Sequence, residues 1–189
     1  MHLLDQLDPN KPVLFLDLCG VIADTYLTRP QGITKLLNDA QVKTNPKFQG
    51  DRIHLPTWDM FRALLIRYDV QVVVVSSWLR CYLSEDHPDV IALSEFLGYP
   101  LKGSLTTTGG FERGESVKRL VTELNPKTWL VVDDAYVQMY EDHQFFNLRH
   151  FVHPHGRFGV GAKELEKIHY ILNDTTSEPD PFFEKLFFT

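Results

Sequence analysis

Short, dense apolar runs alternate with amphipathic stretches along the chain. Three of the runs, PVLFLDL (12–18), VQVVVV (70–75) and TWLVV (128–132), are rich in β-branched and aliphatic residues, and they lack the apolar/polar alternation of a half-exposed strand. Continuous apolar runs of this length are typical of parallel strands that are buried on both faces. The three runs therefore predict the central strands of a parallel sheet.

The stretches between these runs predict helices. The apolar residues that share a helical face are Trp58, Phe61, Leu65 and Tyr68 in one stretch, and Val117, Leu120, Val121 and Leu124 in another. A helix is also expected over 88–97, which opens with a proline and ends before Gly98, and over 162–173. Residues 149–153 predict an edge strand. This alternation predicts an α/β fold, a three-layer Rossmann-like domain with a central parallel sheet.

The length of the chain favours one domain. With 189 residues, 43% of them apolar and 23% charged, it can build one full-sized core but not two. The region 28–55 has weak periodicity and predicts a loop-rich insertion, with a short helix near 32–40, that can cover an active site. The tail DPFFEKLFFT is expected to pack back on the domain, with a dimer contact as the alternative. The oligomeric state stays open.

Charge and cysteine content limit the partners and the compartment. A net charge of −6 argues against an extensive nucleic-acid or anionic-lipid surface. The N-terminus lacks the pattern of a signal peptide, and the longest apolar run falls far short of the ~20 residues that span a bilayer. The two cysteines, Cys19 and Cys81, are too few for a disulfide framework and lack zinc-site spacing. We therefore expect a cytoplasmic chain with no membrane partner.

Polar residues stand where each of the three strong strands ends. The unbroken apolar part of the first run ends at Asp17. The second run is followed by Ser76 and Ser77, and the third by Asp133 and Asp134. One aspartate after a strand is as often a helix N-cap or a turn residue. Because the carboxyl ends of parallel strands meet at one rim, three such strand ends together predict a ligand site. A divalent cation with oxygen ligands would relieve the repulsion among the carboxylates, so we expect Mg²⁺.

Four sequence segments carry a resemblance to a known family. In order along the chain they are FLDLCGVI, VVVVSSW, GESVKRLVTEL and LVVDDAY, within residues 12–140. This order resembles the haloacid dehalogenase-like (HAD) hydrolase superfamily. The SSW variant, the short insertion and the late GRFGVGAKELEKI segment resemble its small, nearly capless branch, which includes phosphatase domains of nucleic-acid repair proteins. The resemblance implies a minimal cap and a phosphorylated small molecule or nucleotide as substrate.

The resemblance also implies roles for the residues at the strand ends. Asp17 would be the nucleophile that forms an aspartyl-phosphate, and it would bind Mg²⁺ together with Asp133 and Asp134. Ser76 would hydrogen-bond the transferring phosphoryl group. Lys118 would hold the charge of that group, as phosphoryl transfer requires.

Other polar residues near these motifs have competing interpretations. Arg113 and Arg119 compete with Lys118 for the role of the phosphoryl-binding cation. Ser77 and Arg80 are candidates for substrate binding. Trp78 either stacks on the substrate or packs beneath the insertion.

Cys19 is the position that departs from the family pattern. Two residues after the nucleophile, phosphatases of this superfamily usually carry a second aspartate, which protonates the leaving group and then activates water. A thiol beside a phosphate and several carboxylates is a poor general base, although its backbone carbonyl can still contribute to the metal site.

Four interpretations of Cys19 remain open. The chain could be an enzyme for leaving groups that need little protonation, or a catalytically weak protein that binds a phosphorylated ligand or a protein partner. It could be an enzyme gated by a disulfide between Cys19 and Cys81. Cys19 could also pack simply as a small hydrophobic residue.

Overall fold

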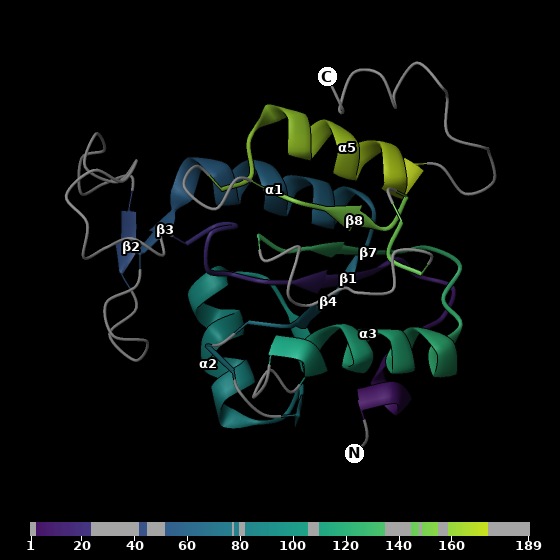
Figure 1. The fold of residues 1–189 in the computed structure, drawn as a ribbon. Helices are drawn as coiled ribbons and strands as arrows, with labels where there is room; N and C mark the ends of the chain where they lie inside the picture. The colour runs from purple at the N-terminus through teal and green to yellow at the C-terminus, as the bar shows by residue number, and fades with distance from the viewer. Residues whose placement is uncertain are drawn as a thin grey trace.

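A mostly parallel sheet of six strands forms the centre of the fold. The computed structural model describes residues 3–23, 42–44, 52–76, 78–79, 82–105, 110–134, 145–147, 149–154 and 159–173. Its elements are η1 (Leu3–Gln6), β1 (Val13–Leu16), β2 (Val42–Thr44), β3 (Arg52–His54), α1 (Leu55–Arg67), β4 (Gln71–Val74), β5 (Leu83–Ser84), α2 (Pro88–Leu97), β6 (Leu101–Ser104), α3 (Gly110–Leu124), β7 (Trp129–Val132), β8 (Phe151–Val152) and α5 (Ala162–Asn173) (Figure 1).

The strand order of this sheet is β5-β6-β4-β1-β7-β8. β1 lies between β4 and β7 and is parallel to both, β6 and β8 extend the parallel sheet outward, and β5 pairs antiparallel with β6. The predicted α/β class with a central parallel sheet is confirmed. The predicted edge strand is also confirmed, because β8 lies at one end of the sheet.

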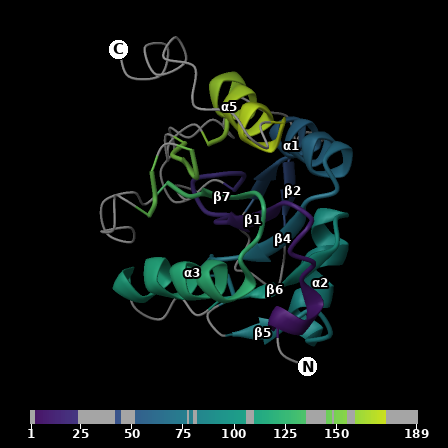
Figure 2. The ribbon, with the colours of Figure 1, turned by 90° about the vertical axis from the view of Figure 1, so that its right-hand side faces the viewer.

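Helices cover both faces of the sheet, which explains the continuous apolar runs. Successive residues of a strand point to opposite faces. Leu14 and Leu16 of β1 pack in one core with residues of α1, α2 and α5, whereas Val13 and Phe15 pack in a second core with α3 and η1. Figure 2 shows α1 and α5 on one side of the sheet and α3 on the other. Every residue of β1, β4 and β7 is buried.

Capping signals account for the helix ends that the sequence predicts best. α2 spans 88–97 as expected, with Pro88 at its first position and His87 as N-cap. Gly98 ends it in the left-handed conformation at φ 64°, which glycine adopts without steric cost. α5 likewise covers the expected range of 162–173.

Several short elements, among them β6, β2 and β3, were not expected from the sequence. β6 has the sequence LKGS, which lacks an apolar run. Within the expected insertion, β2 and β3 pair antiparallel. Ala23, which follows the loop after β1, forms bridges to both Cys19 and Ile53 of β3, so the second strand of this pair is joined to that loop. The expected helix near 32–40 and the aromatic tail lie outside the described residues.

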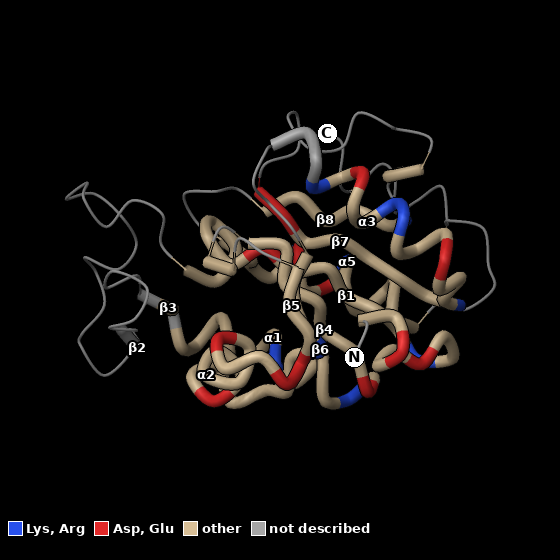
Figure 3. Tube along the Cα trace, turned by 90° about the horizontal axis from the view of Figure 1, so that it is seen from below, with Lys and Arg blue, Asp and Glu red and all other residues tan. Residues whose placement is uncertain are grey.

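Positive and negative residues are mixed along the part of the chain that the structure describes. Lys and Arg are scattered among Asp and Glu along the described trace (Figure 3). None of the described helices combines the length and apolar composition needed to cross a bilayer.

We expect Trp58→Phe to destabilise the fold by about 1–3 kcal/mol, because the substitution leaves a buried carbonyl without its donor. The indole Nε1 of Trp58, in α1, donates to the carbonyl oxygen of Leu97 at 2.7 Å, and the Trp58 side chain is buried. Urea unfolding measures the cost. Met60→Gln is the control on the same helix, since Met60 is 52% exposed, and it should change the free energy of unfolding by no more than about 0.5 kcal/mol. Equal effects of the two substitutions would contradict the assigned role of this hydrogen bond.

Candidate active site

The carboxylates of Asp17 and Asp133 meet because β1 and β7 are in register. Leu16 pairs with Val132, so the next residue of each strand, Asp17 and Asp133, lies at the same level of the sheet. The backbone N–H of Asp17 donates to the carbonyl oxygen of Val132 at 3.0 Å. Both aspartates are buried, with 4% of Asp17 and none of Asp133 exposed to solvent. The parallel register thus brings two acids together at the carboxyl rim.

Asp134 completes a group of three acids. Carboxylate oxygens of Asp17, Asp133 and Asp134 all lie within 4.8 Å of one another, a spacing that a single cation can bridge. The carboxylate of Asp134 lies against the backbone of Gly20, where the Cβ of any other residue would collide with it. Gly20 also has φ +72°, in the left-handed region. A glycine is therefore required at this point of the loop after β1.

Arg113 is the cation that contacts the two buried aspartates. Its Nη1 lies 2.6 Å from Oδ2 of Asp133 and 3.4 Å from Oδ2 of Asp17. The Arg113 side chain is 6% exposed, so solvent screens these interactions weakly. Arg113 stands in the first turn of α3, which packs on the sheet and leads into β7, so this end of the helix lies at the carboxyl rim.

One contact of Lys118 lies away from the acidic group. Its Nζ lies 5.8 Å from the centroid of the Phe145 ring, and Phe145 stacks on Trp129 with a centroid distance of 5.1 Å. Trp129 is the first residue of β7, at the opposite end of that strand from Asp133. Five residues along α3 correspond to about 7.5 Å, which separates Lys118 from the rim that Arg113 reaches. The contact with Asp17 that the structure shows on α3 is that of Arg113.

Sequence spacing contained a signal for Arg113. It precedes Val117 by four residues and Leu120 by seven, so it continues the apolar stripe of α3 toward the rim. All three side chains are buried. A cation on the buried stripe, in the first turn of the helix that leads into the acid-ending strand, is the pattern that favours Arg113 over Lys118.

The electrostatics of this group favour a cation. Burial is the largest cause that raises the pKa of Asp17, to about 7, and the neighbouring Asp133 raises it further. Arg113, the hydroxyl of Ser76 and the backbone N–H of Leu18 act in the opposite direction, the last of these at 2.8 Å from Oδ1. The pKa of Asp134 is also raised, first by burial and then by Asp133. One arginine thus offsets only part of the charge of three carboxylates.

Ser76 and Cys19 lie in neighbouring loops, after β4 and β1, and Cys19 packs against the core on the α1, α2 and α5 side of the sheet. Ser76 is buried, two residues beyond the end of β4, and its hydrogen bond lowers the pKa of Asp17. Cys19 is half-buried, and its Sγ accepts a hydrogen bond from Nε1 of Trp78 at 3.0 Å. Trp78 is only 9% exposed, so its ring packs inside the fold instead of offering an open stacking face to a substrate. Ser77, Arg80 and Cys81 lie outside the described residues.

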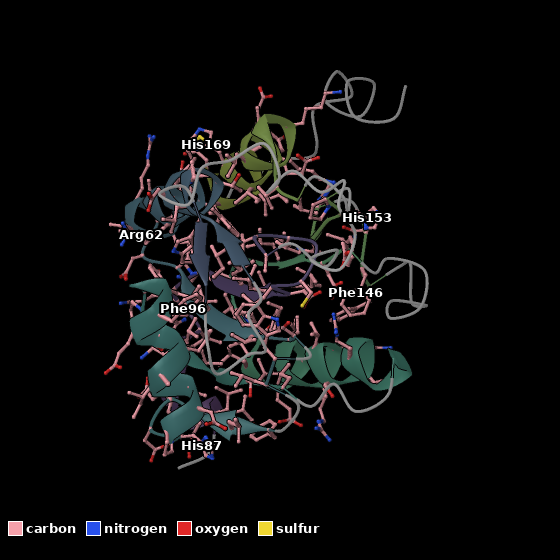
Figure 4. The ribbon with its side chains drawn as sticks, turned by 90° about the vertical axis from the view of Figure 1, so that its left-hand side faces the viewer. Arg62, His87, Phe96, Phe146, His153 and His169 are labelled. Atoms are coloured by element: carbon pink, nitrogen blue, oxygen red, sulfur yellow. The ribbon has the colours of Figure 1, made fainter. Side chains whose placement is uncertain are left out.

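His153 is a neighbour of the acids that the strand-end pattern missed. It follows β8, and its Nδ1 lies 3.1 Å from the carbonyl oxygen of Asp133. Its charge acts to lower the pKa of Asp134. In Figure 4, His153 lies on the same side of the view as Phe146 and opposite Phe96 and Arg62. The residue is exposed to solvent and lies beside the site.

A family model for the HAD domain in Swiss Army Knife RNA repair proteins matches residues 13–165 of this chain. The chain belongs to this family. The match begins at the first residue of β1 and ends within α5, so it includes all the residues described above at the acidic site. No curated protein and no solved structure is similar enough to the chain to count as a match.

Family membership confirms the resemblance seen in the four motifs. The protein is a HAD-like hydrolase domain of the branch related to RNA repair. The acidic group of this HAD domain lies at the ends of the two strands that carry its first and last motifs.

We expect Gly20→Ala to destabilise this HAD domain by more than Gly98→Ala, as measured by urea unfolding. Both glycines have positive φ, so each alanine costs about 1–2 kcal/mol of backbone strain. At Gly98 the added Cβ meets only the flexible end of Arg62, at 3.2 Å. At Gly20 it also displaces the carboxylate of Asp134. Equal costs for the two variants would mean that the contact between Gly20 and Asp134 does not constrain the loop.

Proposed function

We propose that this HAD domain is a Mg²⁺-dependent phosphohydrolase that works through an aspartyl-phosphate on Asp17. The observation that supports this most directly is the buried Asp17 carboxylate, which lies within 4.8 Å of those of Asp133 and Asp134 and beside Arg113. A carboxylate oxygen of Asp17 attacks phosphorus while the bond from phosphorus to the leaving oxygen breaks. Water then attacks the acyl-phosphate, which releases inorganic phosphate and restores the carboxylate.

Mg²⁺ fits this group of residues. Asp17, Asp133, Asp134 and the backbone carbonyl of Cys19 would hold the ion, and the hard oxygen donors suit it. Burial, and after it the charge of Asp133, raises the pKa values of Asp17 and Asp134, and a bound cation would stabilise the ionised carboxylates. When bound, Mg²⁺ would neutralise charge on the transferring phosphoryl group.

Arg113 takes the role that we first expected of Lys118. Its guanidinium offers donors in a planar fork that suits phosphoryl oxygens, and it lies against Asp17 in a site from which water is largely excluded. Ser76 would donate its hydroxyl to a nonbridging phosphoryl oxygen. Both groups would act by positioning and by charge stabilisation, which supply most of the catalysis in phosphoryl transfer.

The family description suggests the substrate. Because the family is named for RNA repair proteins, we propose that the phosphate removed is a terminal phosphate of RNA. The net charge of −6 and the scattered basic positions favour recognition of the strand end over recognition of a long stretch of backbone. Ser77 and Arg80, two candidates for contacts with the nucleotide, follow Ser76 directly in the sequence.

Cys19 is the observation that favours a second candidate function. If the thiol cannot replace the usual acid/base aspartate, the same residues would bind Mg²⁺ and a phosphorylated RNA end without turnover. The domain would then be a binding module built on a hydrolase fold. Mg²⁺-dependent binding of phosphorylated RNA without phosphate release distinguishes this candidate from the enzyme.

We expect Mg²⁺-dependent release of phosphate from an aryl phosphate, from acetyl phosphate and from a phosphorylated RNA oligonucleotide. Asp17→Asn should abolish the release, because an amide is not a nucleophile for phosphorus. Arg113→Gln should lower kcat by at least ~100-fold, whereas Lys118→Gln should have little effect. A large loss in Lys118→Gln with full activity in Arg113→Gln would return the role to Lys118.

Mg²⁺ should raise the melting temperature more at pH 8 than at pH 6. The pKa of Asp17 is about 7 in the folded chain, above its ordinary value of 3.8, so the metal-free fold loses stability as the pH rises through 7. Mg²⁺ binds the ionised carboxylate and competes with the proton, so its stabilising effect grows with pH; at 100 times Kd it amounts to about 2.7 kcal/mol.

Asp17→Asn is the control for this experiment. The amide neither titrates nor offers a charged ligand, so the variant should show a much smaller stabilisation by Mg²⁺ and little difference between the two pH values. The same Mg²⁺-dependent shift in the variant as in the native chain would place the ion elsewhere.

A further inference from the structure

The contact between Trp78 and Cys19 joins the loops that follow two neighbouring strands. β1 and β4 are paired in register, with Leu16 opposite Val74, so their following loops lie next to each other at the carboxyl rim. Trp78 stands in the loop after β4, and its Nε1 lies 3.0 Å from Sγ of Cys19 in the loop after β1. The residue at the usual acid/base position is therefore hydrogen-bonded to Trp78, the tryptophan of the SSW segment.

The fold fixes the direction of the Trp78 indole. The N–H of Leu79 donates to the carbonyl of Ser76 at 3.1 Å, which closes a turn around residue 78. The indole packs against Phe96 of α2 with a centroid distance of 6.5 Å, and only 9% of Trp78 is exposed. A ring held in this way cannot turn its N–H toward solvent without leaving the core.

The indole N–H is a donor only, so it requires an acceptor at position 19. Buried tryptophan N–H groups are usually paired, because leaving one unpaired costs free energy. The sulfur of a thiol accepts weakly, and a carboxylate oxygen would accept the same N–H strongly. The environment of residue 19 is therefore suited to an acceptor side chain in general, of which cysteine is a weak example.

We propose that Trp78 is a positioning residue that holds the acceptor atom of residue 19 in the active site, and that this pair determines which leaving group the site accepts. The inference rests on the proposed phosphohydrolase function. With Sγ bound to Nε1, the side chain of Cys19 has a fixed direction, and only the S–H hydrogen can still rotate about the Cβ–Sγ bond.

Whether the leaving group needs a proton depends on how stable it is with the electron pair of the broken bond. When the bond between phosphorus and the leaving oxygen breaks, the electron pair stays on that oxygen. An alkoxide must then gain a proton, whereas an aryloxide or a phosphate leaves as a stable anion. With Cys19 present, the site favours aryl esters and anhydride-linked terminal phosphates, and a terminal monophosphate of RNA, which is an alkyl ester, would be hydrolysed more slowly. An aspartate at position 19, held by the same N–H, would be positioned to protonate an alkoxide.

The first experiment uses the indole resonances of the ¹⁵N-labelled chain, which contains three tryptophans. Trp78→Phe assigns the Trp78 signal. Cys19→Ala removes the acceptor and should shift the Trp78 indole N–H, while the signals of Trp58 and Trp129 stay in place. Cys19→Ser keeps an acceptor and should restore hydrogen bonding at that N–H. An unchanged Trp78 signal in Cys19→Ala would overturn the proposal.

The second experiment measures whether Trp78 acts through residue 19 on the reaction. Cys19→Asp should raise kcat/KM for an alkyl phosphate more than for an aryl phosphate. In the double variant Cys19→Asp with Trp78→Phe, that selective gain should fall by at least about tenfold, as expected for one hydrogen bond to a charged group. An equal gain with and without Trp78 would overturn the proposal.

Trp58→Phe is the matched control, because it also removes a buried indole donor, but one that bonds Leu97, in α2. Combined with Cys19→Asp, it should lower stability and leave the ratio of alkyl to aryl hydrolysis unchanged. A similar change of the ratio with Trp58→Phe would mean that loss of stability alone causes the effect, and would overturn the proposal.

The proposed phosphohydrolase function and the proposed role of Trp78 can fail separately. If no variant hydrolyses any phosphate while Mg²⁺ still binds, the proposed function fails, and with it the effect on the leaving group. The indole shift would then still show whether Trp78 positions residue 19. Hydrolysis that depends on Asp17, combined with an unmoved Trp78 signal, would overturn only the role of Trp78.

Discussion

Repulsion between the buried carboxylates of Asp17 and Asp133 is the constraint on which the site depends. The register of β1 and β7 gives these acids the same level in the sheet, and burial weakens the screening that water would provide. Arg113 offsets part of this charge from the first turn of α3, at 2.6 Å and 3.4 Å. The site's need for a further cation follows from this crowding, whereas the apolar stripe of α3 sets that helix on the sheet.

Backbone groups of the loop after β1 orient the carboxylates. Gly20 leaves room for the carboxylate of Asp134, and the Leu18 N–H holds one oxygen of Asp17. None of these contacts is strong alone, but each fixes the direction of an acid that would otherwise turn away from its neighbours. A preorganised group of this kind needs little rearrangement when charge develops on a substrate.

The sequence predicted the elements whose signals are local and missed those whose positions depend on packing. The strands β1, β4 and β7 were recognisable because both of their faces are buried, and α2 because Pro88 and Gly98 mark its ends. β6 escaped because Lys102 and Gly103 interrupt any apolar run, and it is a strand because β4 offers it a partner. Because the preference of a residue for a strand depends on its packing partners, the sequence alone predicts strands of this kind poorly.

The residues of the candidate site were likewise predictable only where their signal is local. The three acids were predicted from their places after apolar strands, because the ends of parallel strands converge in any such sheet. The contact of Arg113 with Asp17 was not predicted, because it depends on how far along α3 the rim lies, and the role of Lys118 stays a prediction. The Trp78–Cys19 contact depends on the conformations of two loops, which no periodicity reveals. The roles of Ser77 and Arg80 and the number of domains stay predictions.

The bridges of Ala23 have a consequence for how variable the insertion can be. Ala23 pairs with Cys19 on one side and with Ile53 on the other, and Ile53 is buried. The chain that leaves the loop after β1 at Ala23 therefore returns to the same point at Ile53, so the segment between them is closed at its base. Changing the length of a loop closed in this way costs little, about 0.6 kcal/mol for each doubling. The segment between residues 23 and 53 can thus lengthen or shorten among relatives while the acids at its base keep their geometry.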